Sequence, residues 1–200
     1  MEPAEFARKW NEYTARTGNA EAMPLVTLAF PDAGAPAQAV KFLTDAGLPQ
    51  DWSGPFTFDL AENLRRVSDV FGCYGQPRDW DQDVHERLSG YVYLGFDGGG
   101  NPICLDSEDH AKVVFLDHEH ILDPTLRGWF INSGIAELAE CVLIFQEMLE
   151  DYWREQGEAA ELYEGNVPAS LVEQAQLKMR RADSAVLAEG DYWHTVFEDI

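Results

Sequence analysis

The sequence has few basic residues for its length. It contains 14 Lys and Arg against 36 Asp and Glu, which gives a formal net charge of −22 and a pI of about 4.3. Phosphate backbones and anionic lipid headgroups bind proteins through cationic side chains. The charge therefore argues against direct binding to nucleic acid or to a membrane surface, and it favours a basic protein as the partner.

Cysteines and long apolar runs are also scarce. The three cysteines, Cys73, Cys104 and Cys141, are far apart and form no Cys-x-x-Cys pair. We therefore expect reduced thiols, as in a cytoplasmic protein. The longest apolar stretch, around Val142–Phe145, is too short to span a bilayer. The start of the chain lacks the basic-then-apolar layout of a signal peptide. The sequence thus predicts a soluble cytoplasmic protein.

Motifs for catalysis are missing or incomplete. No serine stands in a Gly-x-Ser-x-Gly motif, and Leu122 occupies the position where a zincin has its second histidine. His118 and His120 follow a predicted strand, where alternate side chains share one face and could meet one metal ion. A third ligand would have to come from Asp123 or from elsewhere. We expect no catalytic residue, no bound metal and no cofactor, and we keep a metal-dependent enzyme as an alternative.

The middle of the chain has the strongest strand signals. Apolar runs alternate with turn residues, and the connections are too short to hold a crossover helix, so the strands should form an antiparallel meander. The glycines at 98–100 are followed by a strand and by no Gly-Lys-Ser/Thr sequence, which favours a hairpin turn over a phosphate-binding loop. The predicted strands are 25–30, 56–58, 91–96, 102–106, 112–116 and 129–131.

Helical periodicity occurs on both sides of this region. The clearest stripe, with spacings of three and four residues, runs from Ile135 to Tyr152, and Asn132 or Ser133 could cap its start. Ser170 and Glu173 could form a capping box for a later helix. The aromatic tail from Tyr192 should pack back on the body. The other predicted helices are 3–17, 37–46 and 168–182. No linker divides the chain, so we expect one α+β domain over residues 1–200, with residues 1–36 as an N-terminal helix and strand extension.

Acidic residues gather in two places that could meet a basic partner. One is the segment 72–83, which is rich in Gly, Pro and Asp and is predicted to be a loop, together with the residues just after it. The other is the turn after the predicted strand 102–106. A tryptophan among carboxylates suggests an interface anchor, although a charge run is usually only a solvated face. The candidate partner-binding residues are Asp79, Trp80, Asp81, Asp83, Glu86, Glu108 and Asp109.

Several short motifs, in order, carry a family resemblance over about Ala37–Ile200. They are Ala46–Pro49, Phe56–Phe58, Tyr93–Asp106, Val113–His118, Phe130–Ser133, Asp183–Leu187 and Tyr192–Trp193. The chain resembles the SUKH superfamily of bacterial immunity proteins, and its fourth family above all. The resemblance implies an antiparallel or mixed sheet flanked by helices. It also implies that the protein binds and neutralises a cognate polymorphic toxin, often one acting on nucleic acid, without a catalytic motif of its own.

Two hypotheses compete with an immunity function. A protein of this fold could be an interaction module whose partner is not a toxin, or it could be the metal-dependent enzyme built around His118 and His120. A toxin reading frame beside the gene would favour immunity over the first alternative, and metal content would test the second. The resemblance and the charge both favour a non-enzymatic inhibitor of a toxin, itself expected to be basic.

Overall fold

The structure is a computed structural model that describes residues 1–19, 22–28, 35–60, 64–70, 82–123, 125, 127–157 and 166–200. At its centre lies a six-stranded sheet whose described strand pairs are all antiparallel. In spatial order its strands are β3 (Phe56–Phe58), β5 (Tyr91–Asp97), β6 (Pro102–Asp106), β7 (Lys112–Phe115) and β8 (Trp129–Asn132), and β4 (Arg65–Arg66) also pairs with β5. The predicted meander is confirmed, and the predicted strand at 129–131 joins it through β7.

The glycines predicted to form a hairpin turn connect β5 to β6. Asp97 closes this turn, because its carboxylate accepts hydrogen bonds from the backbone N–H groups of Gly99 and Asn101, both at 2.9 Å. Gly100 has a φ of 87°, a conformation that glycine adopts without strain. Gly95 allows a close approach elsewhere on β5, since a Cβ there would collide with the carbonyl oxygen of Thr57 on β3. Gly100 therefore allows the tight turn between β5 and β6, and Gly95 allows β3 to pair closely with β5.

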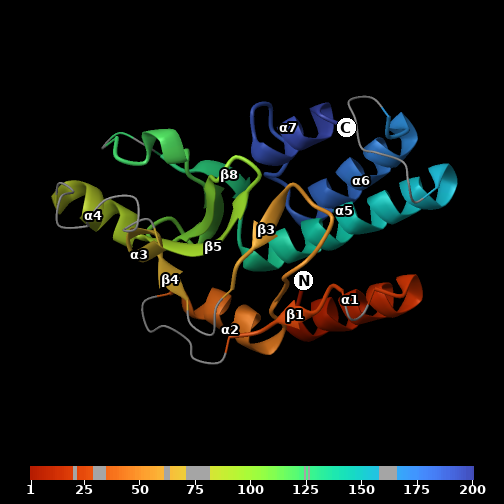
Figure 1. The fold of residues 1–200 in the computed structure, drawn as a ribbon, viewed down its shortest axis with the longest axis horizontal. Coiled ribbons are helices and arrows are strands. Elements are labelled where there is room, and N and C mark those ends of the chain that lie inside the picture. Colours follow the sequence, from red (N-terminus) through yellow and green to blue (C-terminus); the bar gives the residue numbers. More distant parts are fainter. Residues whose placement is uncertain are drawn as a thin grey trace.

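Helix α5 (Ile135–Gln156) runs along one face of the sheet (Figure 1). The predicted apolar stripe is buried, but so are Cys141, Leu143, Ile144 and Met148 on other sides of the helix. Three other helices also pack on α5, which is why it is buried over more than one face. The predicted side-chain cap is wrong: Gly134 is the N-cap residue and provides no side-chain hydrogen bond.

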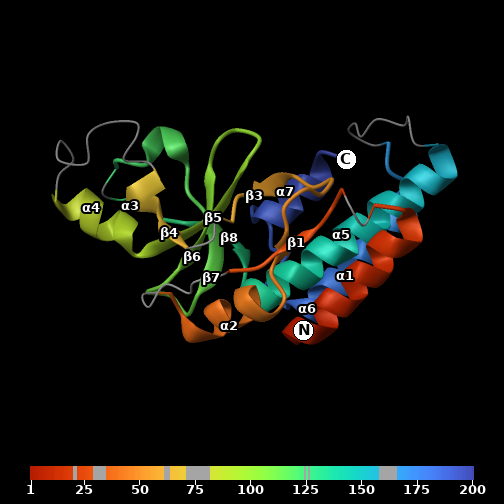
Figure 2. The same cartoon turned by 60° about the horizontal axis from the view of Figure 1, so that its bottom comes forward.

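Three further helices surround α5. They are α1 (Pro3–Thr17), α2 (Ala37–Asp45) and α6 (Ala169–Ala182), close to their predicted bounds. Figure 2 shows α1, α5 and α6 side by side. The predicted capping box at Ser170 is wrong, because Pro168 takes the N-cap position without a side-chain cap. None of the helices in the described ranges has the length and apolar character needed to cross a membrane.

The two faces of the sheet pack against different helices. The face toward α5 carries Phe58, Leu94 and Ile131 and belongs to the larger core, which also includes side chains of α1, α2 and α5. The opposite face carries Tyr93 and Cys104 and forms a smaller core with α3 (Val67–Val70) and α4 (Gln82–Ser89). Helices thus cover both faces, as the views in Figures 1 and 2 show, and the α+β class is confirmed.

The C-terminal segment is attached by a buried polar network. The carboxylate of Asp183, which is 4% exposed, accepts hydrogen bonds from the Asn132 side chain and from both the backbone N–H and the hydroxyl of Ser133. The indole N–H of Trp193 in α7 (Tyr192–Glu198) donates to the Asn132 side-chain oxygen at 3.0 Å. The predicted docking of the tail is confirmed, and Asn132 and Ser133 bind Asp183 where the sequence suggested a helix cap.

Two predicted segments differ from the structure. Of the described residues in the run 25–30, only Leu25–Val26 form a strand, β1, which pairs with β2 (Leu48–Pro49). The predicted loop 72–83 ends earlier than expected, since Gln82 and Asp83 already belong to α4. The rest of that loop up to residue 81 lies outside the described residues.

Candidate functional site

The candidate acidic residues that the structure describes lie near one end of β5. Asp83 and Glu86 are exposed on α4, which leads through Gly90 into β5. The backbone N–H of Ser107 donates to the carbonyl of Gly90 at 2.9 Å, so the turn between β6 and β7 packs against the end of α4. Glu108 in that turn is exposed. We call Asp83, Glu86, Glu108 and Asp109 the acidic end.

Within the acidic end, Asp109 already has a cationic neighbour. Lys112 Nζ lies 2.7 Å from its carboxylate, while the backbone N–H groups of Glu108 and Asp109 both donate to Asp106. The other three candidates, Asp79, Trp80 and Asp81, lie outside the described residues. Among the described residues, the two predicted acidic clusters therefore meet where the end of α4 contacts the turn between β6 and β7.

The candidate metal ligands are arranged differently from the prediction. His118 and His120 lie in a 3₁₀ helix, η3 (His118–His120), and not on a strand, so they do not share a face as alternate strand residues would. The Nδ1 atom of His118 lies 2.9 Å from the Asn101 side-chain oxygen, and that of His120 lies 2.7 Å from the Asp117 carboxylate. In the described ranges, no three His, Cys, Asp or Glu side chains are placed to hold a metal ion.

Cys104 and Cys141 are free thiols buried in the two cores. Burial raises the pKa of the Cys141 thiol to about 12 and raises that of Cys104 well above its ordinary value. Both are protonated at neutral pH and are poor nucleophiles, because the thiolate is the reactive form. These two thiols contribute packing, and Cys73 lies outside the described residues.

The opposite end of β5 combines a cavity with aromatic side chains. A cavity of about 380 Å³ lies between the β5–β6 turn, β8 and α7. Phe115, Trp129 and Tyr192 line it, with Phe115 stacked on Trp129 at a centroid distance of 5.8 Å and lying 5.6 Å from Tyr192. Asp97 and Asp199 also line it, and no Lys, Arg or His is found among its described lining residues. We call this cavity the turn pocket.

A second cavity lies beside the same turn. Gly99 and Gly100 form one wall, and η3 with Leu122 and Asp123 forms the other. The large hydrophobic side chains that the described residues expose are Phe96, Leu122, Trp129 and Leu177. Three of these four surround the turn, because Phe96 directly precedes Asp97 and the other two line its cavities. Clustered exposed apolar groups are typical of interaction surfaces.

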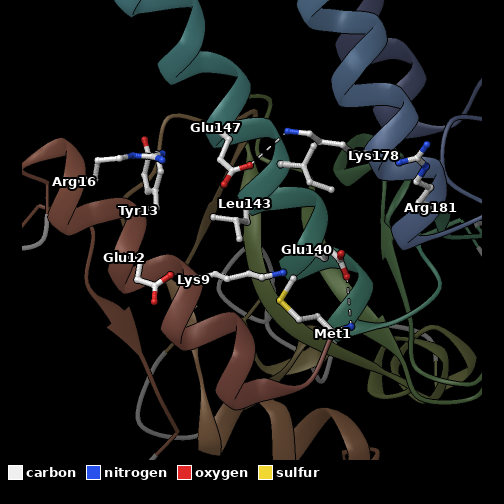
Figure 3. Close-up of a pocket in the computed structure, with 11 residues that line it drawn as sticks. Met1, Lys9, Glu12, Tyr13, Arg16, Glu140, Leu143, Glu147, Lys178 and Arg181 are labelled. Carbon is white, nitrogen blue, oxygen red and sulfur yellow. Dashed lines mark ion pairs between the residues drawn. The ribbon is translucent and has the colours of Figure 1, made fainter.

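A groove between α1, α5 and α6 has the opposite electrostatic character (Figure 3). Its volume is about 500 Å³, and Leu143 and Ile144 of α5 are among its lining residues. Lys178 lies 3.7 Å from Glu147, and the N-terminal amine lies 3.5 Å from Glu140. The groove also collects Lys9, Arg16 and Arg181, so cationic groups outnumber carboxylates there. It is poorly suited to a basic partner.

Sequence reasoning placed the candidate site at the acidic clusters and missed the turn pocket. The turn itself and the aromatic tail were both recognised, but as structural elements. Trp129 and Tyr192 are separated along the chain, and only the pairing of β7 with β8 and the packing of α7 bring them together. The available signal was an aromatic residue, Trp129, at the start of a predicted strand.

Comparison with known proteins gives one finding. A family model, described as SUKH-4 immunity protein, matches residues 17–199. No curated protein and no solved structure matches the chain. The match covers all of the elements described above except α1. That helix ends at Thr17, the residue at which the match begins.

Proposed function

The chain belongs to the SUKH-4 immunity protein family, and we propose that it neutralises a basic toxin that acts on nucleic acid. Membership of the family implies an immunity function against a toxin. The chemistry of the toxin is our inference from the net charge of −22. An enzyme that holds a phosphate backbone needs a basic surface, and a strongly acidic protein can bind that surface in place of the substrate.

Inhibition by direct binding suits the residues of this chain. The two described thiols are buried and protonated, and the rings of the two candidate histidines contact different side chains, Asn101 and Asp117. These features support a protein that acts as a binder and not as an enzyme. We place its action in the cytoplasm, where a toxin that cuts or modifies nucleic acid finds its substrate.

The acidic end and the turn pocket would contribute differently to the complex. The exposed carboxylates Asp83, Glu86 and Glu108 would attract a basic toxin over a distance and raise the association rate. Asp79, Trp80 and Asp81, which lie outside the described residues, remain candidates for contact with the toxin. Apolar side chains that lose water in the complex, such as Trp129 at 54% exposure, would lower the dissociation rate.

Co-expression tests the proposal. The reading frame beside this gene should encode a protein that stops growth of a laboratory bacterium when it is expressed alone. Co-expression of this chain should restore growth, and the two purified proteins should form a stoichiometric complex that no longer degrades or modifies nucleic acid. A matched control is an unrelated acidic protein of similar charge, which should not rescue growth.

The outcome that contradicts the proposal is equally direct. If the neighbouring protein is harmless alone, or if it stays toxic beside this chain while the chain is folded and abundant, neutralisation of that protein is wrong. If the neutralised toxin acts on membranes or protein substrates, the immunity function stands and the nucleic-acid part of the proposal fails.

A further inference from the structure

We infer that the turn pocket receives an arginine side chain of the bound partner, an inference that rests on the proposed function. The pocket meets the requirements of a guanidinium site through two kinds of groups. Phe115, Trp129 and Tyr192 supply aromatic faces, and Asp97 and Asp199 supply negative charge. A guanidinium group stacks on aromatic rings and pairs with carboxylates, and it loses its water more easily than a lysine ammonium does.

The aromatic wall is already in place without a partner. Trp129 is 54% exposed although its ring stacks on Phe115 with an interplanar angle of 21°, so one face of the indole remains open. The Tyr192 ring is fixed at the other side, because its hydroxyl donates to the carbonyl of Pro55 at 3.2 Å and its neighbour Trp193 is buried. Preformed rings reduce the entropy lost when a ligand binds.

The charge of the pocket is also fixed by the fold. Both oxygens of the Asp97 carboxylate are held in the turn, one by backbone N–H groups and the other by the Asn101 side chain at 2.9 Å. These bonds hold the carboxylate in position while its negative charge stays available to a cation. Asp97 and Tyr192 line the same pocket. Burial, and after it the charge of Asp97, raises the pKa of Tyr192. Asp199 is exposed at the rim beside Thr195.

Charge selects the occupant of the pocket. The two carboxylates are opposed by no cationic side chain among the described lining residues, so an acidic or phosphorylated segment would be repelled. A purely apolar side chain would bury the carboxylates without a counterion, which is costly. An arginine satisfies both the rings and the charge, and the basic surface of the proposed partner would supply one. The cationic groove between α1, α5 and α6 cannot take this role.

The test uses the full chain and a small probe, so the toxin is not needed. The ¹⁵N-labelled protein is titrated at low salt with N-acetyl-arginine amide and, in parallel, with N-acetyl-citrulline amide, which has nearly the same shape without the charge. We expect saturable shifts of the Trp129 indole N–H and of the Gly98 and Gly99 amides with the arginine compound only. Assignment of the indole signal follows from Trp129→Phe.

Two variants and a control make the test specific. Asp199→Asn should weaken binding of the arginine compound several-fold, and Trp129→Ala should weaken it about fivefold, read from the glycine amides. Glu198→Gln removes the same charge from the neighbouring position, which does not line the pocket, and should leave the affinity unchanged. All three positions are exposed, so the fold should be retained.

The inference is overturned if citrulline and arginine compounds cause equal shifts, if the shifts occur at Glu108 and Asp109 and not at the turn, or if Asp199→Asn and Glu198→Gln behave alike. Its failure is distinguishable from failure of the proposed function. If the protein does not bind the arginine compound but still rescues growth, only the arginine site is rejected. If it binds the arginine compound but does not rescue growth, the proposed neutralisation of the toxin is rejected.

Discussion

At the end of the sheet where α4 leads into β5, the exposed groups are carboxylates on a short helix and a turn, whereas at the opposite end carboxylates stand beside exposed aromatic rings. The first end can attract a basic partner, but its described residues include none of the large hydrophobic side chains that the structure shows exposed. The second end has a cavity lined by three aromatic rings and two carboxylates. The difference teaches that charged residues and a binding cavity can lie on separate parts of one surface. The charges can be recognised in the sequence, whereas the cavity cannot.

The largest expected effect comes from removing the support beneath the turn pocket. Phe145 of α5 packs against Trp193 at a centroid distance of 5.4 Å and against Phe197, both in α7, the helix that carries Tyr192. Phe145→Ala should lower the free energy of unfolding by about 3–5 kcal/mol, because it leaves a cavity in the core. Urea denaturation followed by circular dichroism measures the change.

Glu147→Ala on the same helix is the control for that prediction. Glu147 is only partly buried and pairs with Lys178 at 3.7 Å, so its removal should change stability by less than about 1 kcal/mol. Equal losses from the two substitutions would show that α5 does not support α7 in the way described.

A smaller loss is expected from the polar network behind the pocket. Trp193→Phe keeps most of the ring but removes the N–H that donates to Asn132, leaving a buried oxygen without that partner. Stability should fall by about 1–3 kcal/mol. Trp129→Phe, at the exposed wall, should change it by less than about 0.5 kcal/mol. Comparable effects at the two tryptophans would contradict the distinction between the buried network and the open wall.

Charge reversal at the acidic end should alter kinetics and leave stability nearly unchanged. Asp83→Lys combined with Glu108→Lys should slow association with the toxin several-fold, an effect that shrinks as salt rises, while dissociation changes little. Stopped-flow association at several salt concentrations measures this. Glu12→Lys combined with Glu173→Lys changes the net charge equally at other exposed positions. If the two double substitutions slow association equally, the net charge of the whole molecule attracts the partner, and the acidic end does not contribute more than other surfaces.

The smallest effect concerns the second cavity beside the turn. A hydrogen bond and the nearby charge of Asp117 raise the pKa of His120 above its ordinary value, and the same bond lowers that of Asp117. The histidine contribution to stability is therefore complete below about pH 6.5 and is lost as the pH rises through the raised pKa. In Asp117→Asn, the pKa of His120 measured by NMR should fall. An unchanged value would show that the pair does not form in solution.

The sheet and the long helices could be predicted because their signals are local. The strands at 91–97, 102–106 and 112–115 are separated by turn residues, and α5 has a regular apolar stripe. The predicted cap of α5 was wrong for a non-local reason: Asn132 and Ser133 bind Asp183, which lies about fifty residues away along the chain. A capping pattern cannot reveal a stronger partner from another element.

The candidate site was predicted less well, for a similar reason. Acidic residues close together in the sequence were easy to recognise, and α4 and the adjoining turn do expose them. The turn pocket needs Asp97, Trp129 and Tyr192 from three separate elements. The two histidines were placed on a strand because the predicted strand was extended by a few residues, whereas β7 ends at Phe115 and both histidines lie in η3.

Helix α1 shows that the limits of sequence similarity and of a stable protein need not coincide. The family match begins at residue 17, yet Phe6 and Trp10 of α1 are fully buried and Gln146 of α5 donates to the Tyr13 hydroxyl at 3.0 Å. A truncated protein that starts at residue 17 would expose the apolar side chains of α5 that α1 covers, and we expect it to aggregate. Anyone who shortens this protein, fuses it to another or shuffles it among its relatives has to carry the first helix along.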